Sequence, residues 1–240
     1  MRAIILAGGK GTRLAPYTTV IPKPLVPIGG KMPILEVVIR QLKANGFEHI
    51  TVTVNHMAHL IRAFFGDGLQ WGLKIDYSQE DRPLGTIGPL TLIRDLPENF
   101  LVMNGDLICD LNFKSFFDFH CAGCNKVTVA ACRRRQKIDF GVLTFDSNNN
   151  HLVSFSEKPE YTFDVSMGIY CFNRSIIREL KIGEPYGFDK LMIDRLKAKK
   201  QTNIFPFDGL WYDIGRPSDY DDVNSHFERI RGILGLDLTS

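Results

Sequence analysis

The sequence predicts an α/β protein with a Rossmann-like, doubly wound and mostly parallel mixed sheet. The chain opens on a short apolar run, Ala3–Ala7, that passes directly into glycine, as a buried strand feeding a loop does. Strand-like and helix-like patterns then alternate as far as residue 103, which is typical of doubly wound sheets. Finally, glycine and carboxylate residues follow several apolar runs, and open α/β sheets bind ligands at the carboxyl ends of their strands.

The first half of the chain supplies the alternating elements. Apolar residues at helical spacing, closed by Asn45-Gly46 in one case and by Gly66-Asp67-Gly68 in another, predict helices. Short apolar or alternating runs between them predict strands. We therefore expect helices at 33–42, 57–65 and 86–94, and strands at 49–54, 73–77 and 100–103.

The second half is richer in strand patterns. Strands are expected at 127–132, 141–146, 152–155, 165–172 and 202–205, and helices at 174–180, 191–199 and 217–230. Ser147–Asn150 has the composition of a hairpin turn. With no repeat, low-complexity tract or linker, we expect one domain over 1–240 that carries a small β-rich lobe in its second half.

Composition and charge exclude several classes of protein. The chain has 240 residues, 44% of them hydrophobic, and a net charge of +2, which does not favour a nucleic-acid partner. The basic cluster Arg133–Arg135 with Lys137 is explained as well by a solvated strand end or loop as by an anionic partner. No apolar run approaches the length of about 20 residues that spans a bilayer, so we expect a cytoplasmic protein with no membrane partner.

Five cysteines are present, an odd number that argues against a disulfide framework. Cys121 and Cys124 have the CxxC spacing of a zinc or redox pair, with His120 beside them. One such pair is a weak signal. We favour incidental thiols near the end of a helix, and the sequence does not say whether the pair has a role.

A glycine-rich loop with nearby cations follows the first apolar run. Gly8, Gly9 and Gly11 let backbone N–H groups approach phosphate oxygens, and Arg13 and Lys23 can neutralise them. The spacing fits neither a P-loop nor the Gly-x-Gly-x-x-Gly fingerprint. A plain glycine turn remains the alternative.

Charged residues at later strand ends extend the possible site. Asp106 and Asp213 suit Mg²⁺, which is often held by one or two carboxylates plus substrate phosphates. Both can instead cap turns, as aspartates often do. Lys158, beside Glu157 and before a proline, can grip a second phosphate, although an exposed surface pair explains it equally well.

Together these motifs resemble the sugar-1-phosphate nucleotidylyltransferases. The resemblance covers residues 2 to about 222 and rests on eight motifs in the family's order: GGKGTRL, PKPL, LGT-x-G, NGD, FGV, EKP, GIY and W-x-DIG. It is nearest to the mannose-1-phosphate and manno-heptose-1-phosphate guanylyltransferases, notably in LGT-x-G-P-L and LVMNGD. A nucleotide-diphospho-sugar transferase fold is implied, with a nucleotide-binding half at about 1–110, a sugar-phosphate half at about 111–222, and a C-terminal helix and tail at about 217–240.

The resemblance implies a reaction in which a nucleoside triphosphate and a sugar 1-phosphate give an NDP-sugar and pyrophosphate, with Mg²⁺ as cofactor. Arg13 and Lys23 are the implied catalytic residues. The implied nucleotide-binding residues are Leu6, Ala7, Gly8, Gly9, Gly11, Thr12, Arg13, Lys23, Glu80, Gly85, Thr86, Asn104 and Gly105. The implied sugar-phosphate residues are Gly141, Glu157, Lys158, Ser166 and Gly168, and the implied metal ligands are Asp106 and Asp213.

The identities of base and sugar stay open. A carboxylate at Glu80 can accept hydrogen bonds from guanine, and with the resemblance this favours GTP over CTP, UTP or dTTP with glucose 1-phosphate. Many relatives have Asn-Ala-Gly where this chain has Ser166-Met167-Gly168, and the shorter serine favours a heptose. A catalytically silent NDP-sugar-binding homologue is a further alternative, and the pattern leaves open whether the chain forms a homo-oligomer.

Overall fold

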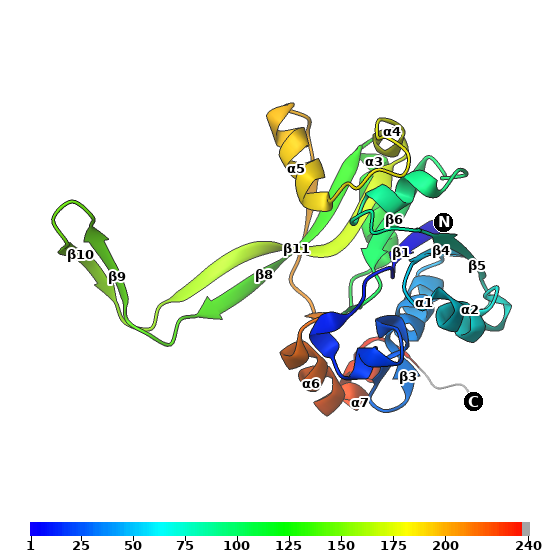
Figure 1. Ribbon diagram of the computed structural model, residues 1–240, viewed down its shortest axis with the longest axis horizontal. Helices are drawn as coiled ribbons and strands as arrows, with labels where there is room; N and C mark the ends of the chain where they lie inside the picture. Colours follow the sequence, from blue (N-terminus) through cyan, green and yellow to red (C-terminus); the bar gives the residue numbers. More distant parts are fainter. Residues whose placement is uncertain (237–240) are drawn as a thin grey trace.

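A computed structural model describes residues 1–236, and it confirms the α/β class and the mostly parallel sheet (Figure 1). Seven strands form the central sheet in the order β12-β8-β11-β6-β1-β4-β5. The neighbours β6, β1, β4 and β5 are all parallel, and β11 is antiparallel to both β6 and β8. The strands are β1 (Arg2–Leu6), β4 (His49–Val54), β5 (Lys74–Gln79), β6 (Asn99–Asn104), β8 (Val127–Lys137), β11 (Glu160–Asn173) and β12 (Asn203–Phe207).

Helices cover both faces of this sheet. Ala3 and Ile5 of β1 lie in one hydrophobic cluster, and Ile4 lies in another on the opposite face, which explains why the first strand reads as an unbroken apolar run. The helices are α1 (Ile34–Ala44), α2 (Ala58–Phe65), α3 (Phe113–Ala122), α4 (Ser175–Arg178), α5 (Phe188–Lys197), α6 (Pro217–Ser225) and α7 (Phe227–Ile233). In the part of the chain that the structure describes, no helix is long and apolar enough to cross a membrane.

Short elements complete the fold. Five 3₁₀ helices are described: η1 (Thr12–Leu14), η2 (Tyr17–Thr19), η3 (Lys23–Leu25), η4 (Leu69–Trp71) and η5 (Gly88–Leu92). Three two-stranded sheets pair β2 (Pro27–Ile28) with β3 (Met32–Pro33), β7 (Leu107–Cys109) with β13 (Trp211–Asp213), and β9 (Val142–Asp146) with β10 (His151–Ser156). The β7–β13 pair places Asp213 opposite Leu107, the residue that follows Asp106.

Two expected helices differ from the structure. The segment 86–94 contains only η5, in which the N–H groups of Leu90 and Ile93 donate to the carbonyls three residues earlier (3.0 and 3.2 Å), while those of Ile87 and Gly88 donate to the distant Tyr186 carbonyl (2.9 and 3.0 Å). The helix expected at 217–230 is two helices, α6 and α7, that meet at His226, whose backbone leaves the helical region. The expected strand at 49–54 is β4 without change, and Cys121 lies at the end of α3, with Cys124 just beyond it, as expected.

The β-rich part of the second half is an extended arm, defined here as residues 133–166. The strands β8 and β11 run beyond the central sheet as a two-stranded ribbon, and the β9–β10 hairpin continues from its end (Figure 1). The basic cluster Arg133–Arg135 lies in the exposed C-terminal part of β8, as expected of a solvated strand end, and not in a loop; the strand continues to Lys137 instead of ending at residue 132. Within the described chain, no residue from Arg133 to Ser166 is buried.

One histidine is buried in the body of the fold. His120 is fully buried in α3, where its Nδ1 shares a 2.8 Å hydrogen bond with the Thr128 hydroxyl. Its Nε2 has no hydrogen-bond partner among the residues that the structure describes. Burial therefore penalises the imidazolium and lowers the pKa of His120 to about 4.

This pKa predicts a loss of stability in acid. The unfolded chain takes up a proton at His120 near the ordinary pKa of about 6.5, whereas the folded chain resists it down to about pH 4. The contribution of His120 is thus complete above pH 6.5 and is lost as the pH falls through that window, by at most about 1.4 kcal/mol per pH unit. We expect His120→Gln to flatten this part of the profile, measured by urea unfolding between pH 7 and pH 4.5. His151→Gln, at an exposed histidine, is the control, and an equal flattening in both variants would contradict the prediction.

Candidate active site

The glycine-rich loop borders a cavity of about 370 Å³, the first cavity, at the carboxyl end of β1. Because β1 lies between the parallel strands β4 and β6, this loop leaves the sheet from its interior and not from an edge. Gly11 has a φ of 66°, in the left-handed region that favours glycine. The Thr18 hydroxyl donates a 2.9 Å hydrogen bond to the Gly11 carbonyl, which fixes the return of the loop toward Lys23.

Every residue that the resemblance implies for nucleotide binding lines this one cavity. The set comes from five separate stretches of the chain, which meet at the ends of neighbouring strands. These residues are Leu6, Ala7, Gly8, Gly9, Gly11, Thr12, Arg13, Lys23, Glu80, Gly85, Thr86, Asn104 and Gly105, and Asp106 lines the cavity with them.

Glu80 is buried against the glycine loop. Its Oε2 accepts a 3.0 Å hydrogen bond from the Leu84 N–H, which shapes the turn leading to Gly85. A side chain at Gly8 would overlap Oε1 of the same carboxylate. Burial raises the pKa of Glu80, and its hydrogen bonds to Leu84 and Asn55 oppose that rise. One carboxylate oxygen thus holds the turn, and the other faces the loop at the cavity.

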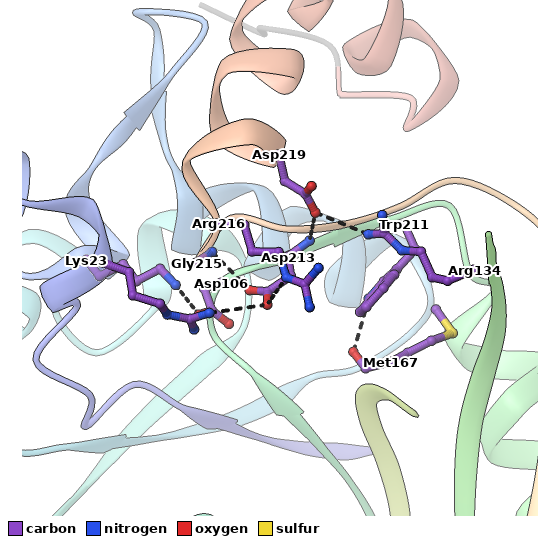
Figure 2. Close-up of polar contacts among 10 residues, drawn as sticks. Lys23, Asp106, Arg134, Met167, Trp211, Asp213, Gly215, Arg216 and Asp219 are labelled. Carbon is purple, nitrogen blue, oxygen red and sulfur yellow. Dashed lines mark hydrogen bonds and ion pairs between the residues drawn. The ribbon is translucent and has the colours of Figure 1, made fainter. Parts of the chain in front are cut away.

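A cluster of opposite charges, the charged centre, lies around Gly215 (Figure 2). Lys23 Nζ pairs with Asp106, and Arg13 lies 4.0 Å from Asp213. A Cβ on Gly215 would stand 2.6 Å from the Arg13 guanidinium, and 2.8 Å from both Lys23 Nζ and Asp213 Oδ1. Gly215 therefore leaves the space in which these charged groups meet, while its N–H donates a 2.9 Å hydrogen bond to Asp213.

Backbone pairing brings Asp106 and Asp213 together. In the antiparallel β7–β13 pair, Asp213 lies opposite Leu107, and the Ile214 N–H donates a 2.9 Å hydrogen bond to the Asp106 carbonyl. Within residues 1–236, no group of three or more His, Cys, Asp and Glu side chains is arranged to hold a metal ion. Two carboxylates nevertheless suit Mg²⁺. This ion usually takes only one or two carboxylate ligands from the protein and completes its coordination with phosphate oxygens and waters.

A second cavity, of about 540 Å³, shares Asn104 with the first cavity and is lined by Asp213 as well. Ser166 and Gly168 line it, as do Arg134 and Arg216. Arg134 stacks over the Trp211 ring at 4.6 Å and forms a 3.2 Å ion pair with Asp219 (Figure 2). The second cavity therefore has a cationic and aromatic wall at the root of the arm.

Three expected site residues lie elsewhere. Gly141, Glu157 and Lys158 are on the exposed arm and line neither cavity. They do lie together, since a Cβ on Gly141 would stand 3.2 Å from Glu157 Oε2. The structure thus keeps these residues as one group but separates them from the rest of the expected site.

Sequence reasoning missed several residues that shape the site. Trp211 and Gly215 both belong to the W-x-DIG motif, so a signal for them was present but only Asp213 was taken from it. Arg134 belongs to the basic run Arg133–Arg135, and such a run is typical of solvent-exposed residues and not of a cavity wall. Asp219 gave no signal, because its role depends on α6 lying against β13: it accepts a 3.0 Å hydrogen bond from the Asp213 N–H as well as the ion pair from Arg134.

A doubly wound sheet with a glycine loop and cavities at its strand ends is the architecture of α/β nucleotide-binding proteins. The family profile described as "Nucleotidyl transferase" matches residues 2–229. The chain belongs to this nucleotidyl transferase family.

Relatives and solved structures agree with this membership. The chain is 33% identical over 227 residues to a mannose-1-phosphate guanylyltransferase catalytic subunit beta of Danio rerio, and 35% identical over 228 residues to a mannose-1-phosphate guanyltransferase of Candida albicans. Each alignment covers 92% of this chain and 62% of the relative, so the chain spans about three fifths of their length. HddC from Yersinia pseudotuberculosis complexed with GMP-PN is 27% identical, with a TM-score of 0.70 and coverage of 94% of this chain and 99% of that one.

The packing at Gly215 predicts a selective defect. In Gly215→Ala the new methyl group displaces the tips of Arg13 and Lys23, which are flexible and can move without unfolding the chain. We expect kcat for nucleotidyl transfer to fall about 10- to 100-fold, because small misplacements of charged groups are costly in catalysis. The free energy of unfolding should change by less than about 1 kcal/mol. Gly232→Ala, where a Cβ meets nothing within 4 Å, is the matched control. A wild-type rate for Gly215→Ala would show that catalysis does not need the space that Gly215 leaves for Arg13 and Lys23.

Proposed function

We propose that the chain transfers a nucleotidyl group, making an NDP-sugar and pyrophosphate from a nucleoside triphosphate and a sugar 1-phosphate. The observation that carries the proposal is the charged centre at Gly215, which lies where two cavities meet. A reaction that joins two anions needs a place for each and cations between them. The similarity to guanylyltransferases supports the same reaction.

Each part of the site has a role in this reaction. The glycine loop from Gly8 to Arg13 binds the triphosphate in the first cavity, and the sugar 1-phosphate occupies the second. An oxygen of the sugar phosphate then attacks the α-phosphorus, and pyrophosphate leaves. Arg13 and Lys23 hold the phosphates and offset the charge that develops on them, which is the main demand of phosphoryl-type transfer. No nucleophilic side chain is required.

Asp106 and Asp213 are the proposed ligands of a Mg²⁺ ion. Bound there, the ion would offset phosphate charge and orient the oxygens that it contacts. The pairing of both carboxylates with cations supports the assignment, because the phosphates of the substrates can take over those cations and leave the carboxylates free.

GTP is the proposed nucleotide. Glu80 lies in the first cavity beside Gly85 and Thr86, and a carboxylate accepts the two N–H groups that the guanine edge presents. The HddC structure complexed with GMP-PN supports a guanine nucleotide in this fold. Transfer from CTP, UTP or dTTP to glucose 1-phosphate is the second candidate.

Mannose 1-phosphate or manno-heptose 1-phosphate is the proposed acceptor. The relatives that act on mannose 1-phosphate support the first. Ser166 supports the second, because its short side chain lines the second cavity and leaves more room than the asparagine of many relatives.

Pyrophosphate release from the purified protein tests the proposal. Each of the four nucleotides is combined with mannose, manno-heptose and glucose 1-phosphates in the presence of Mg²⁺. We expect the fastest turnover with GTP and a manno-configured sugar. Nucleotide binding without turnover of any pair would instead identify a silent NDP-sugar-binding homologue.

The metal assignment predicts that Asp106→Asn and Asp213→Asn each lower Mg²⁺-dependent turnover by about 100-fold or more, as the loss of a group that stabilises transition-state charge does. Initial rates across a Mg²⁺ titration and a thermal melt measure activity and stability separately. Asp95→Asn is the control, because Asp95 also pairs with a buried cation, Arg2 (3.1 Å), but lines neither cavity. Near-normal rates in both site variants would rule the assignment out.

The base assignment predicts a change of specificity in Glu80→Gln. The amide oxygen can still accept the hydrogen bond from the Leu84 N–H. The amide NH₂ group, however, is itself a donor and cannot accept the hydrogen bonds that the N–H groups of guanine offer. We expect kcat/KM for GTP to fall about 10- to 100-fold with little change for UTP, measured with both nucleotides under the same conditions. Asp81→Asn, the exposed neighbouring carboxylate, should leave the preference intact. Equal losses for GTP and UTP in Glu80→Gln would mean that Glu80 only shapes the loop.

A further inference from the structure

The acceptor phosphate of the proposed reaction needs a cation that faces the second cavity. Arg13 and Lys23 line the first cavity and not the second, and Lys158 lines neither. Among the residues that the structure describes, three basic side chains border the second cavity: Arg134, Arg135 and Arg216. Their surroundings differ, and the differences decide which of them is free to bind a phosphate.

Arg134 is already committed to other groups. Its guanidinium stacks over the Trp211 ring at 4.6 Å and forms a 3.2 Å ion pair with Asp219, whose side chain is only 12% exposed. A phosphate that drew Arg134 away would leave this carboxylate without its cation, and an uncompensated charge that is withdrawn from water is strongly destabilising. Arg134 therefore belongs to the wall of the cavity.

Arg135 borders the cavity from the ribbon of the arm. It is exposed and lies opposite Thr162 in the β8–β11 ladder. Because side chains alternate along a strand, Arg135 leaves β8 on the face opposite to Arg134. It therefore does not face the wall that Arg134 and Trp211 form.

The backbone of Arg216 is held in place on both sides. Its N–H donates a 3.0 Å hydrogen bond to the Asp213 carbonyl, and its own carbonyl accepts a 3.0 Å hydrogen bond from the Tyr220 N–H in α6. Pro217 disfavours a helical conformation at the residue before it, and Arg216 is accordingly extended, with φ −102° and ψ 128°. The side chain is thus anchored next to Gly215, at the charged centre.

The side chain of Arg216, by contrast, is loosely held. Its Nε lies 3.8 Å from Asp213 Oδ2, which is beyond hydrogen-bond distance, and the side chain is 60% exposed. Within the described chain, Asp213 is its only side-chain partner. An exposed ion pair of this kind contributes little to stability, so the guanidinium can turn to another anion at little cost.

Asp213 lies between two arginines that face different cavities. Its Oδ2 is 4.0 Å from Arg13 and 3.8 Å from Arg216 (Figure 2). Arg13 lines the first cavity, and Arg216 lines the second. One carboxylate therefore holds one cation from each side of the site, and each cation is free to serve the anion on its own side.

We propose that Arg216 binds the phosphate of the sugar 1-phosphate in the second cavity. The inference rests on the proposed function, which places a sugar phosphate there. A planar guanidinium can donate two parallel N–H bonds to phosphate oxygens. Because Arg216 is anchored next to Gly215, it holds the phosphate beside the charged centre. There, one phosphate oxygen forms the bond to the α-phosphorus, while the bond to pyrophosphate breaks and its electron pair leaves with the pyrophosphate.

Steady-state kinetics of Arg216→Gln separates the two substrates. We expect the KM for mannose 1-phosphate to rise about 10- to 100-fold, as the loss of a charge-assisted hydrogen bond does, while the KM for GTP stays within about twofold. Arg216→Lys keeps the charge without the planar fork, so its KM should lie between those of the wild type and Arg216→Gln. Arg133→Gln is the control, because Arg133 pairs with the exposed Asp164 (3.2 Å) and lines neither cavity. It should keep both KM values.

A role in orienting Asp213 alone predicts a different result. Arg216→Gln would then raise the Mg²⁺ concentration needed for the half-maximal rate and leave the KM for mannose 1-phosphate unchanged. That outcome, or an equal rise in the KM of both substrates, would overturn the proposal. Because the side chain is exposed, the thermal melt of Arg216→Gln should match that of the wild type.

Calorimetric titration with mannose 1-phosphate tests binding apart from turnover. GTP is present and Mg²⁺ is removed. We expect Arg216→Gln to bind the sugar phosphate about 10- to 100-fold more weakly than the wild type. Equal binding by both chains, or no binding by the wild type, contradicts the proposal. If the wild type turns over no substrate pair, the proposed function fails, and this titration still decides whether Arg216 binds a sugar phosphate.

Discussion

The pairing of opposite charges around Gly215 is the interaction on which the rest of the site depends. Lys23 and Asp106 are 83 positions apart in the sequence and pair in a site where the lysine is only 10% exposed. A cation that is withdrawn from water needs a partner, since an unpaired one is strongly destabilising. The pair therefore ties the loop after β1 to the turn after β6, and the more exposed Arg13 extends from the same loop to within 4.0 Å of Asp213 in β13.

The same cluster determines where the arm begins. Asp219, in the first turn of α6, accepts hydrogen bonds from the Asp213 N–H and from Arg134. One carboxylate thus connects the charged centre to the root of the arm (Figure 2). Because Trp211 lies between Arg134 and Met167, the second cavity and the direction of the ribbon are fixed by a single set of contacts.

The sequence predicts the parts of the fold that local chemistry determines. The apolar run of β1, the glycine loop and the strand β4 follow from periodicity and from the special backbone freedom of glycine. The shared cavity of Gly8, Glu80 and Asn104 follows from the rule that parallel strands end at one edge. The division of the last helix at His226 and the 3₁₀ turn at Gly88 depend on packing partners far along the chain, such as Tyr186, which no local pattern reveals. The β-rich lobe was expected but its extended form was not, because the exposed residues Arg133–Arg135 alternate between the two faces of β8 and gave no sign that the strand continues.

Charge balance explains how one site can be stable both before and during the proposed reaction. Without substrates, Lys23 pairs with Asp106, and Arg13 and Arg216 both lie near Asp213, so the buried lysine and the two carboxylates each have a partner of opposite charge. In the proposed reaction the phosphates take the cations, and the carboxylates take a divalent ion in exchange. Each group exchanges one partner of opposite charge for another, so the field around the α-phosphorus is set by side chains that are already in place. Gly215 suits this exchange, because a side chain there would overlap Arg13, Lys23 and Asp213.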